Sequence, residues 1–168
     1  MFAGLGRYLA RGRSGHDEAR VAWTEVRHLP TTDPELAAKY MQAVARANTR
    51  VEKPVYHVAL AFHPDDPVTP AIMRRAAHRL LADLGLEEHQ AVIVAHRDRE
   101  HPHLHLMVNR VHPQTGKVWD RSFDYRRIEA SLRRQEVEFG VRIVPGRHAE
   151  LPEREHGPGG APTPPIAE

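Results

Sequence analysis

Residues 91–116 read AVIVAHRDREHPHLHLMVNRVHPQTG, and this stretch decides the fold. Segment 91–96 is apolar at every position, as expected for a central strand that is covered on both faces. Segment 103–112 alternates between apolar and polar residues, and a short polar stretch separates the two segments. This pattern is typical of two antiparallel strands joined by a hairpin. A turn at residues 99–100 would place His96 opposite His103.

Three histidines of this hairpin are predicted to share one face of the sheet. Opposed residues of an antiparallel pair point to the same side with Cβ atoms about 5 Å apart, so His96 and His103 become neighbours. His105 lies two residues beyond His103 and therefore shares its face, about 6.6 Å along the strand. The leucines between them would point into the core, and the histidines outward. Three such imidazoles predict a metal site with open coordination positions, as in catalytic centres.

Further polar residues of the hairpin extend this site. Asp98 is expected to lie opposite His101, where either group could hold an imidazole in one tautomer. Asn109 is expected on the same face farther along the strand, within reach of a substrate. The alternative is that these histidines are half-exposed polar residues of a solvent-facing strand, with Pro102 making the hairpin irregular. The dense arrangement of histidines around one turn favours the metal site.

Outward from the hairpin, the remaining elements predict an α+β fold. Capping residues and helical spacing indicate helices over residues 33–48, 69–85 and 124–140. Strands are expected over residues 55–62 and, more weakly, 21–26. Because the two strong strands of the hairpin follow each other directly, the sheet should be mainly antiparallel. We expect this central sheet to carry its helices on one face.

The composition limits the kinds of site and partner. The 168 residues contain no cysteine, so any metal must be held by imidazole or oxygen ligands. The formal charge is only +2, although Arg7 and Arg11 open the chain with a basic segment that could neutralise phosphates. No apolar run could cross a bilayer, so we expect a cytoplasmic protein without membrane insertion. Residues 146–168 are rich in proline and glycine and are expected to form a disordered tail after a domain of residues 1–145.

The stretch from His96 to Arg110 resembles the third motif of conjugative and mobilisation relaxases, which are HUH endonucleases. The resemblance continues through NRVHPQTGKVWD (109–120) and includes AFHPDD (61–66) and the N-terminal FAGLGRYLARG (2–12). It covers about residues 2 to 146. Relaxases of this type have a strand before the tyrosine motif, which this chain is expected to lack. They often carry a serine in the strand where this chain has Ala59 and Ala61.

The resemblance implies a tyrosine nucleophile, and Tyr8 is the tyrosine that lies in the first motif. Tyr40 is expected in the core on a helix face, Tyr56 lies in a strand, and Tyr125 opens a helix. Attack by Tyr8 on a phosphodiester would leave a 5′-phosphotyrosyl link. The candidate catalytic residues are Tyr8, as the nucleophile, and Asp98, as a group that could hold an imidazole in one tautomer.

The resemblance also implies the cofactor and partners of His96, His103 and His105. The expected ion is Mg²⁺ or Mn²⁺, although imidazole ligands would also accept Zn²⁺. The expected substrate is the single-stranded origin of transfer of a plasmid, with relaxosome accessory proteins and a coupling protein as further partners. Two alternatives stay open, namely a truncated remnant that binds single-stranded DNA without cutting it and a three-histidine zinc hydrolase. The candidate DNA-binding residues are Arg7, Arg11, Asn109 and Arg110.

Overall fold

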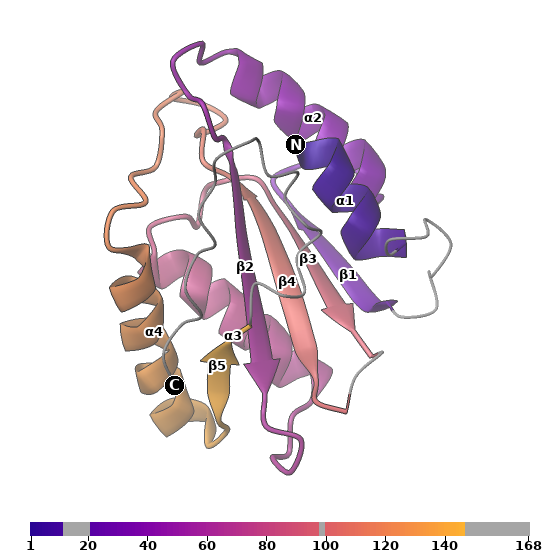
Figure 1. Cartoon of the computed structure of the whole chain (residues 1–168), viewed down its shortest axis with the longest axis vertical. Helices are drawn as coiled ribbons and strands as arrows, with labels where there is room; N and C mark the ends of the chain where they lie inside the picture. The colour runs from indigo at the N-terminus through magenta and orange to yellow at the C-terminus, as the bar shows by residue number, and fades with distance from the viewer. Residues whose placement is uncertain (12–20, 98–99, 147–168) are drawn as a thin grey trace, which may run out of the picture.

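The computed structural model describes residues 1–11, 21–97 and 100–146, which form one open sheet with four helices (Figure 1). The five strands pair antiparallel throughout, in the order β1-β3-β4-β2-β5. The strands are β1 (Val21–Arg27), β2 (Val55–Phe62), β3 (Ala91–His96), β4 (His103–Asn109) and β5 (Ile143–Pro145). The helices are α1 (Phe2–Arg11), α2 (Pro34–Arg46), α3 (Pro70–Asp83) and α4 (Asp124–Phe139). The predicted α+β class with a mainly antiparallel sheet is therefore confirmed.

The helix boundaries follow from the capping residues that the sequence provides. At the start of α2 the Asp33 side chain accepts a hydrogen bond from the backbone of Glu35, at 3.2 Å. Thr69 caps α3 in the same way through the backbone of Ile72. Gly140 ends α4 with a φ of 69°, a conformation that glycine adopts without a steric penalty. These predicted helices are confirmed.

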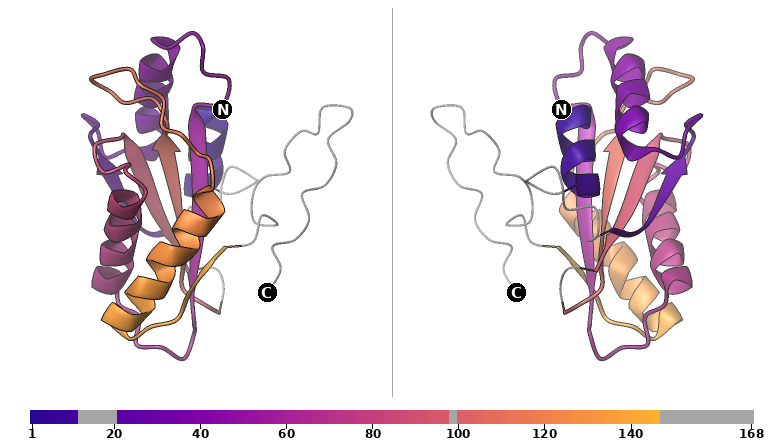
Figure 2. Two further views of the ribbon diagram at one scale, coloured as in Figure 1. Left: turned by 90° about the vertical axis from the view of Figure 1, so that its left-hand side faces the viewer. Right: turned by 90° about the vertical axis from the view of Figure 1, so that its right-hand side faces the viewer.

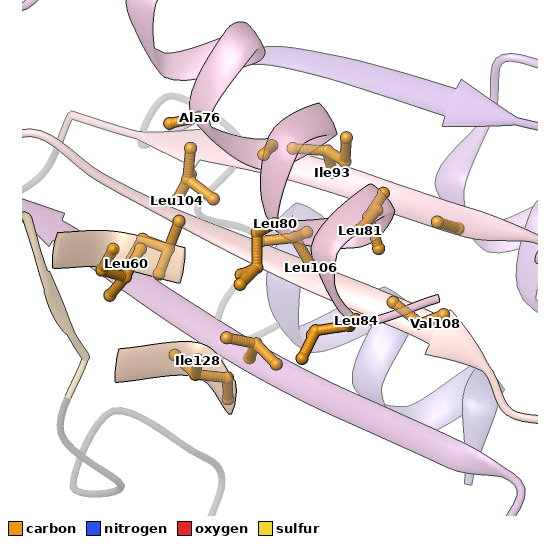
Figure 3. Packing of buried hydrophobic residues seen from close by; sticks show 14 of the residues in the cluster. Leu60, Ala76, Leu80, Leu81, Leu84, Ile93, Leu104, Leu106, Val108 and Ile128 are labelled. Atoms are coloured by element: carbon orange, nitrogen blue, oxygen red, sulfur yellow. The ribbon is translucent and has the colours of Figure 1, made fainter. Parts of the chain in front are cut away.

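The helices cover both faces of the sheet, so the prediction that they pack on one face was wrong. On one face α3 and α4 form a first core around Ile93 and Leu106, and Figure 3 shows leucines of α3 pointing toward β4. On the other face α1 and α2 form a second core around Val94 and Met107. Figure 2 shows α1 and α3 on opposite sides of the strands. The physical reason is that β3 and β4 are buried at every position, which requires cover on both sides.

Two elements of the domain were not predicted. Helix α1 carries two glycines, and β5 is only three residues long. Within the described residues, β1 and β5 form the two edges of the sheet. Among the described helices, none combines the length and apolarity that a bilayer span requires.

Gly6 of α1 packs closely against α2. A Cβ atom built on Gly6 would lie 3.2 Å from Ala38 Cβ and 3.3 Å from the backbone oxygen of Pro34. Gly4, two residues earlier on the same helix, has nothing within 4 Å of that position. The seating of α1 on the second core therefore depends on the missing side chain of Gly6.

We predict that Gly6→Val lowers the free energy of unfolding by about 1–3 kcal/mol because the added methyl groups overpack this contact. Gly4→Val is the matched control, and it should change the same free energy by less than about 0.5 kcal/mol. Urea unfolding followed by circular dichroism measures both values. Equal effects at the two positions would contradict the packing of α1 described above.

Candidate metal centre

The pairing of β3 with β4 brings the three predicted histidines together. His96 lies opposite His103, and Val94 lies opposite His105 in the same register. The ring centroid of His96 lies 5.2 Å from that of His103 and 4.7 Å from that of His105. The ring centroids of His103 and His105 are 5.5 Å apart. One ring nitrogen from each histidine lies within 4.8 Å of the other two. The predicted convergence of His96, His103 and His105 is confirmed, and we call these residues the histidine triad.

The histidine triad is buried, although the sequence predicted that it faces outward. The exposed fractions of His96, His103 and His105 are 3%, 2% and 2%. These side chains lie on the face of the sheet that also carries the second core. Burying an imidazole away from water is costly unless its polar nitrogens keep hydrogen-bond partners. The hydrogen-bond partners of each ring therefore show how the burial of these polar nitrogens is compensated.

Two members of the triad are held by backbone carbonyl groups. His96 donates from Nε2 to the Leu9 oxygen of α1 at 2.7 Å. His103 donates from Nδ1 to the His101 oxygen over a longer 3.4 Å. A carbonyl can only accept, so in a neutral ring the lone pair is on Nδ1 of His96 and on Nε2 of His103.

The third member of the triad contacts another side chain. Nδ1 of His105 lies 3.0 Å from Nε2 of His57, and the two rings stack with centroids 5.1 Å apart. His57 is half-buried on β2 and shares the face of the triad, because its neighbour Ala59 lies directly opposite His105. No local sequence pattern indicates a role for His57, because only the pairing of β2 with β4 brings it close to His105.

The triad fits a divalent cation. Two imidazole nitrogens bound to one ion at about 2.1 Å lie about 3–4 Å apart, so the rings need only small movements from their present separation. Three nitrogen ligands leave coordination positions for substrate oxygens. On the β2 side the small side chains of Ala59 and Ala61 lie opposite His105 and His103 and are partly exposed. The triad can therefore hold a cation, and only small side chains of β2 lie opposite two of its members.

Helix α1 brings the region of Tyr8 to the triad. Tyr8 is partly buried against the second core, and the residue after it, Leu9, accepts the hydrogen bond from His96. The other tyrosines lie elsewhere: Tyr56 is buried in the first core, on the opposite face, with its hydroxyl 3.0 Å from Asp124. Tyr40 is 42% exposed, so its predicted place in the core was wrong, and Tyr125 is 43% exposed.

Asn109 and Arg110, two of the candidate DNA-binding residues, both make hydrogen bonds that join neighbouring segments of the domain. Asn109 is fully buried, and its amide nitrogen donates to the oxygens of Met41 and Gln90. Arg110 donates from Nε and Nη2 to the Trp119 carbonyl, and burial lowers the pKa of its guanidinium. Both residues lie at the far end of β4, about 20 Å from His103. Asn109 therefore has no exposed surface that could contact DNA in this structure, whereas the DNA contact expected of Arg110 stays a prediction.

Of the remaining predicted site residues, the structure describes Arg7 and Arg11 but not Asp98. Arg7 is exposed on α1, and Arg11 forms an ion pair with Glu35 at 2.7 Å. Asp98 lies outside the described residues, and so do residues 147–168 of the expected tail.

An open antiparallel sheet whose inner strands carry three buried, hydrogen-bonded histidines places the protein in the class of α+β domains with a candidate metal site. The chain belongs to the relaxase family described as MobA/VirD2-like, nuclease domain, whose model matches residues 8–141. The predicted resemblance to mobilisation relaxases is confirmed. The match begins at Tyr8 and includes the whole triad.

Known relaxases and related proteins show similarity over much of the chain. Protein MobA of Acidithiobacillus ferrooxidans is 31% identical over 120 residues, which cover 70% of this chain and 29% of MobA. Protein TraI of Escherichia coli is 28% identical over 130 residues, covering 77% of this chain and 17% of TraI. The group II intron-interrupted relaxase LtrB of Lactococcus lactis subsp. cremoris is 34% identical over 65 residues, covering 39% of this chain and 12% of LtrB. The chain spans less than a third of the length of these relatives.

We predict that the protein binds one Mn²⁺ ion per chain and that the double variant His103→Ala, His105→Ala loses this binding. The reason is that two of the three imidazole ligands are removed. Isothermal titration calorimetry at constant pH measures the stoichiometry and affinity. His78→Ala is the control, because His78 is a half-exposed histidine on α3 that pairs with Glu25. Unchanged binding in the double variant would exclude the triad as the metal site.

Tyr56 gives a prediction about stability at high pH. Burial, followed by the charge and hydrogen bond of Asp124, raises the pKa of Tyr56 above the ordinary value of about 10. Its stabilising contribution is therefore complete below pH 10 and declines as the pH rises toward the folded-state pKa, because the phenol ionises first in the unfolded chain. Urea unfolding at several pH values above 9 should show a steeper loss of stability in the wild type than in Tyr56→Phe. Tyr125→Phe is the control, and a wild-type slope equal to that of Tyr56→Phe would contradict the assignment.

Proposed function

We propose that this domain is a metal-dependent, site- and strand-specific endonuclease that nicks the origin of transfer of a plasmid in conjugative mobilisation. In this proposal Tyr8 is the nucleophile and forms a 5′-phosphotyrosyl intermediate. The observation that carries the proposal is the hydrogen bond from His96 of the triad to Leu9, the residue next to Tyr8. Membership of the relaxase nuclease family supports it independently.

The triad residues His96, His103 and His105 would hold the cation, and the backbone and His57 contacts would keep their rings oriented. When bound, a divalent cation supplies positive charge that stabilises the negative charge developing on the phosphate oxygens. Mg²⁺ or Mn²⁺ is the proposed ion, and Zn²⁺ is compatible with the same ligands.

The proposed reaction is a transesterification. The phenol oxygen of Tyr8 gives up its proton and forms a bond to the scissile phosphorus, while the bond from phosphorus to the 3′ oxygen breaks. The departing 3′ oxygen takes up a proton and becomes a hydroxyl group. One phosphodiester bond is exchanged for another, so the strand can later be rejoined by the reverse reaction. Asp98 is proposed as a further catalytic residue, which would hold an imidazole of the site in one tautomer.

The proposed substrate is single-stranded DNA at the transfer origin. Arg7 is exposed on the same helix as Tyr8 and would attract the phosphate backbone, and Arg11 lies one turn farther along. Accessory relaxosome proteins, a coupling protein and a cytoplasmic location are part of the same proposal.

The covalent step is tested with single-stranded oligonucleotides that cover the transfer origin, labelled at the 3′ end and incubated with the protein and Mn²⁺. We predict a labelled protein band that survives SDS and is absent in Tyr8→Phe, because phenylalanine has no oxygen to bond to phosphorus. Tyr125→Phe, which removes an exposed tyrosine hydroxyl elsewhere, should retain the band. The complementary strand should give no adduct.

Other outcomes separate the alternatives. Cleavage by Tyr8→Phe without an adduct would replace the proposal with hydrolysis by a metal-bound water. Binding of the oligonucleotides without cutting by the wild type would indicate a DNA-binding remnant.

A further inference from the structure

We propose that His57 is a positioning residue of the metal centre, which fixes the tautomer and ring orientation of His105. The inference rests on the proposed metal-dependent function and deepens it. His57 would not contact the cation or the DNA. It would act by accepting a hydrogen bond from Nδ1 of His105, so that Nε2 of His105 carries the lone pair for the cation.

The pairing of β2 with β4 creates this contact. Ala59 lies directly opposite His105, and His57 lies opposite Met107, so His57 is the diagonal neighbour of His105 on the same face. The two rings stack at an interplanar angle of 23°, and Nε2 of His57 lies 3.0 Å from Nδ1 of His105. Both the position and the orientation of the His105 ring therefore depend on His57.

Only one direction of this hydrogen bond is compatible with a cation on Nε2 of His105. If His57 donates, Nδ1 of His105 is the acceptor and its single proton lies on Nε2, where it blocks a metal. If His105 donates, its Nε2 carries the lone pair and His57 carries its own proton on Nδ1. Cation binding therefore requires His57 to act as the acceptor.

His105 differs in this respect from the other two members of the triad. His96 and His103 donate to the backbone oxygens of Leu9 and His101, which can only accept. The backbone thereby determines their tautomers. The His105 tautomer instead depends on a side chain that can either donate or accept. A substitution of His57 can consequently change metal binding without touching a ligand.

The test compares two substitutions of His57 in the whole chain. His57→Leu keeps most of the side-chain volume but cannot accept a hydrogen bond, whereas the amide oxygen of His57→Gln can accept from Nδ1 of His105. Binding of Mn²⁺ is measured from the electron paramagnetic resonance signal of the free ion. We expect about 10- to 100-fold weaker binding in His57→Leu and recovery to within about 3-fold of the wild type in His57→Gln. His78→Leu, a half-exposed histidine on α3, is the control and should bind like the wild type.

A second measurement reads the tautomer directly in the wild type. Long-range ¹H–¹⁵N spectra of the ¹⁵N-labelled protein with Zn²⁺, which is diamagnetic, should show the His105 proton on Nδ1 and the metal on Nε2. Metal bound to Nδ1 of His105 would overturn the inference even if the His57 variants fail to fold.

The remaining outcomes distinguish this inference from the proposed function. Equal Mn²⁺ affinity in His57→Leu and wild type would overturn the role of His57 and leave the nickase proposal standing. Equal weakening in His57→Leu and His57→Gln, with unchanged thermal stability of the metal-free proteins, would also overturn it. Absence of Mn²⁺ binding by the wild type would overturn the metal centre itself, and the positioning role with it.

Discussion

The antiparallel register of β3 and β4 is the constraint on which the site depends. Because His96 of β3 lies opposite His103 of β4, these two imidazoles point to one face of the sheet, and His105, two residues beyond His103, points to the same face. Side chains alternate along a strand, so a slip of one residue would move His103 and His105 to the opposite face. The triad then could not form, whatever the rest of the chain did.

The two cores fix this register. Leu104 and Leu106 of β4 are fully buried in the first core, whereas Met107 belongs to the second core on the other face. A slipped strand would place the histidines among the leucines of α3, where burying their polar nitrogens would be costly. Cover on both faces therefore selects the same register that builds the triad. It also lets α1 reach the triad, since Leu9 accepts the hydrogen bond from His96.

The sequence was sufficient where the relevant interactions are local. The hairpin joins β3 to β4 through a few residues, so the meeting of His96 with His103 could be predicted from spacing. The starts of α2 and α3 were marked by Asp33 and Thr69. Contacts between distant segments could not be predicted. His57 and His105 are 48 residues apart in the sequence and come together only because β2 pairs with β4. Asn109 follows the alternation of β4, but nothing local indicated that α2 covers it through Met41.

The central claim is that two neighbouring strands present three imidazoles to one cation, and a crystal structure of the protein with Mn²⁺ tests it most directly. Anomalous scattering at the manganese edge locates the ion independently of the protein density. The account predicts a peak about 2.0–2.3 Å from one ring nitrogen each of His96, His103 and His105. A manganese peak bound elsewhere, with these three rings turned away from a common point, would contradict it.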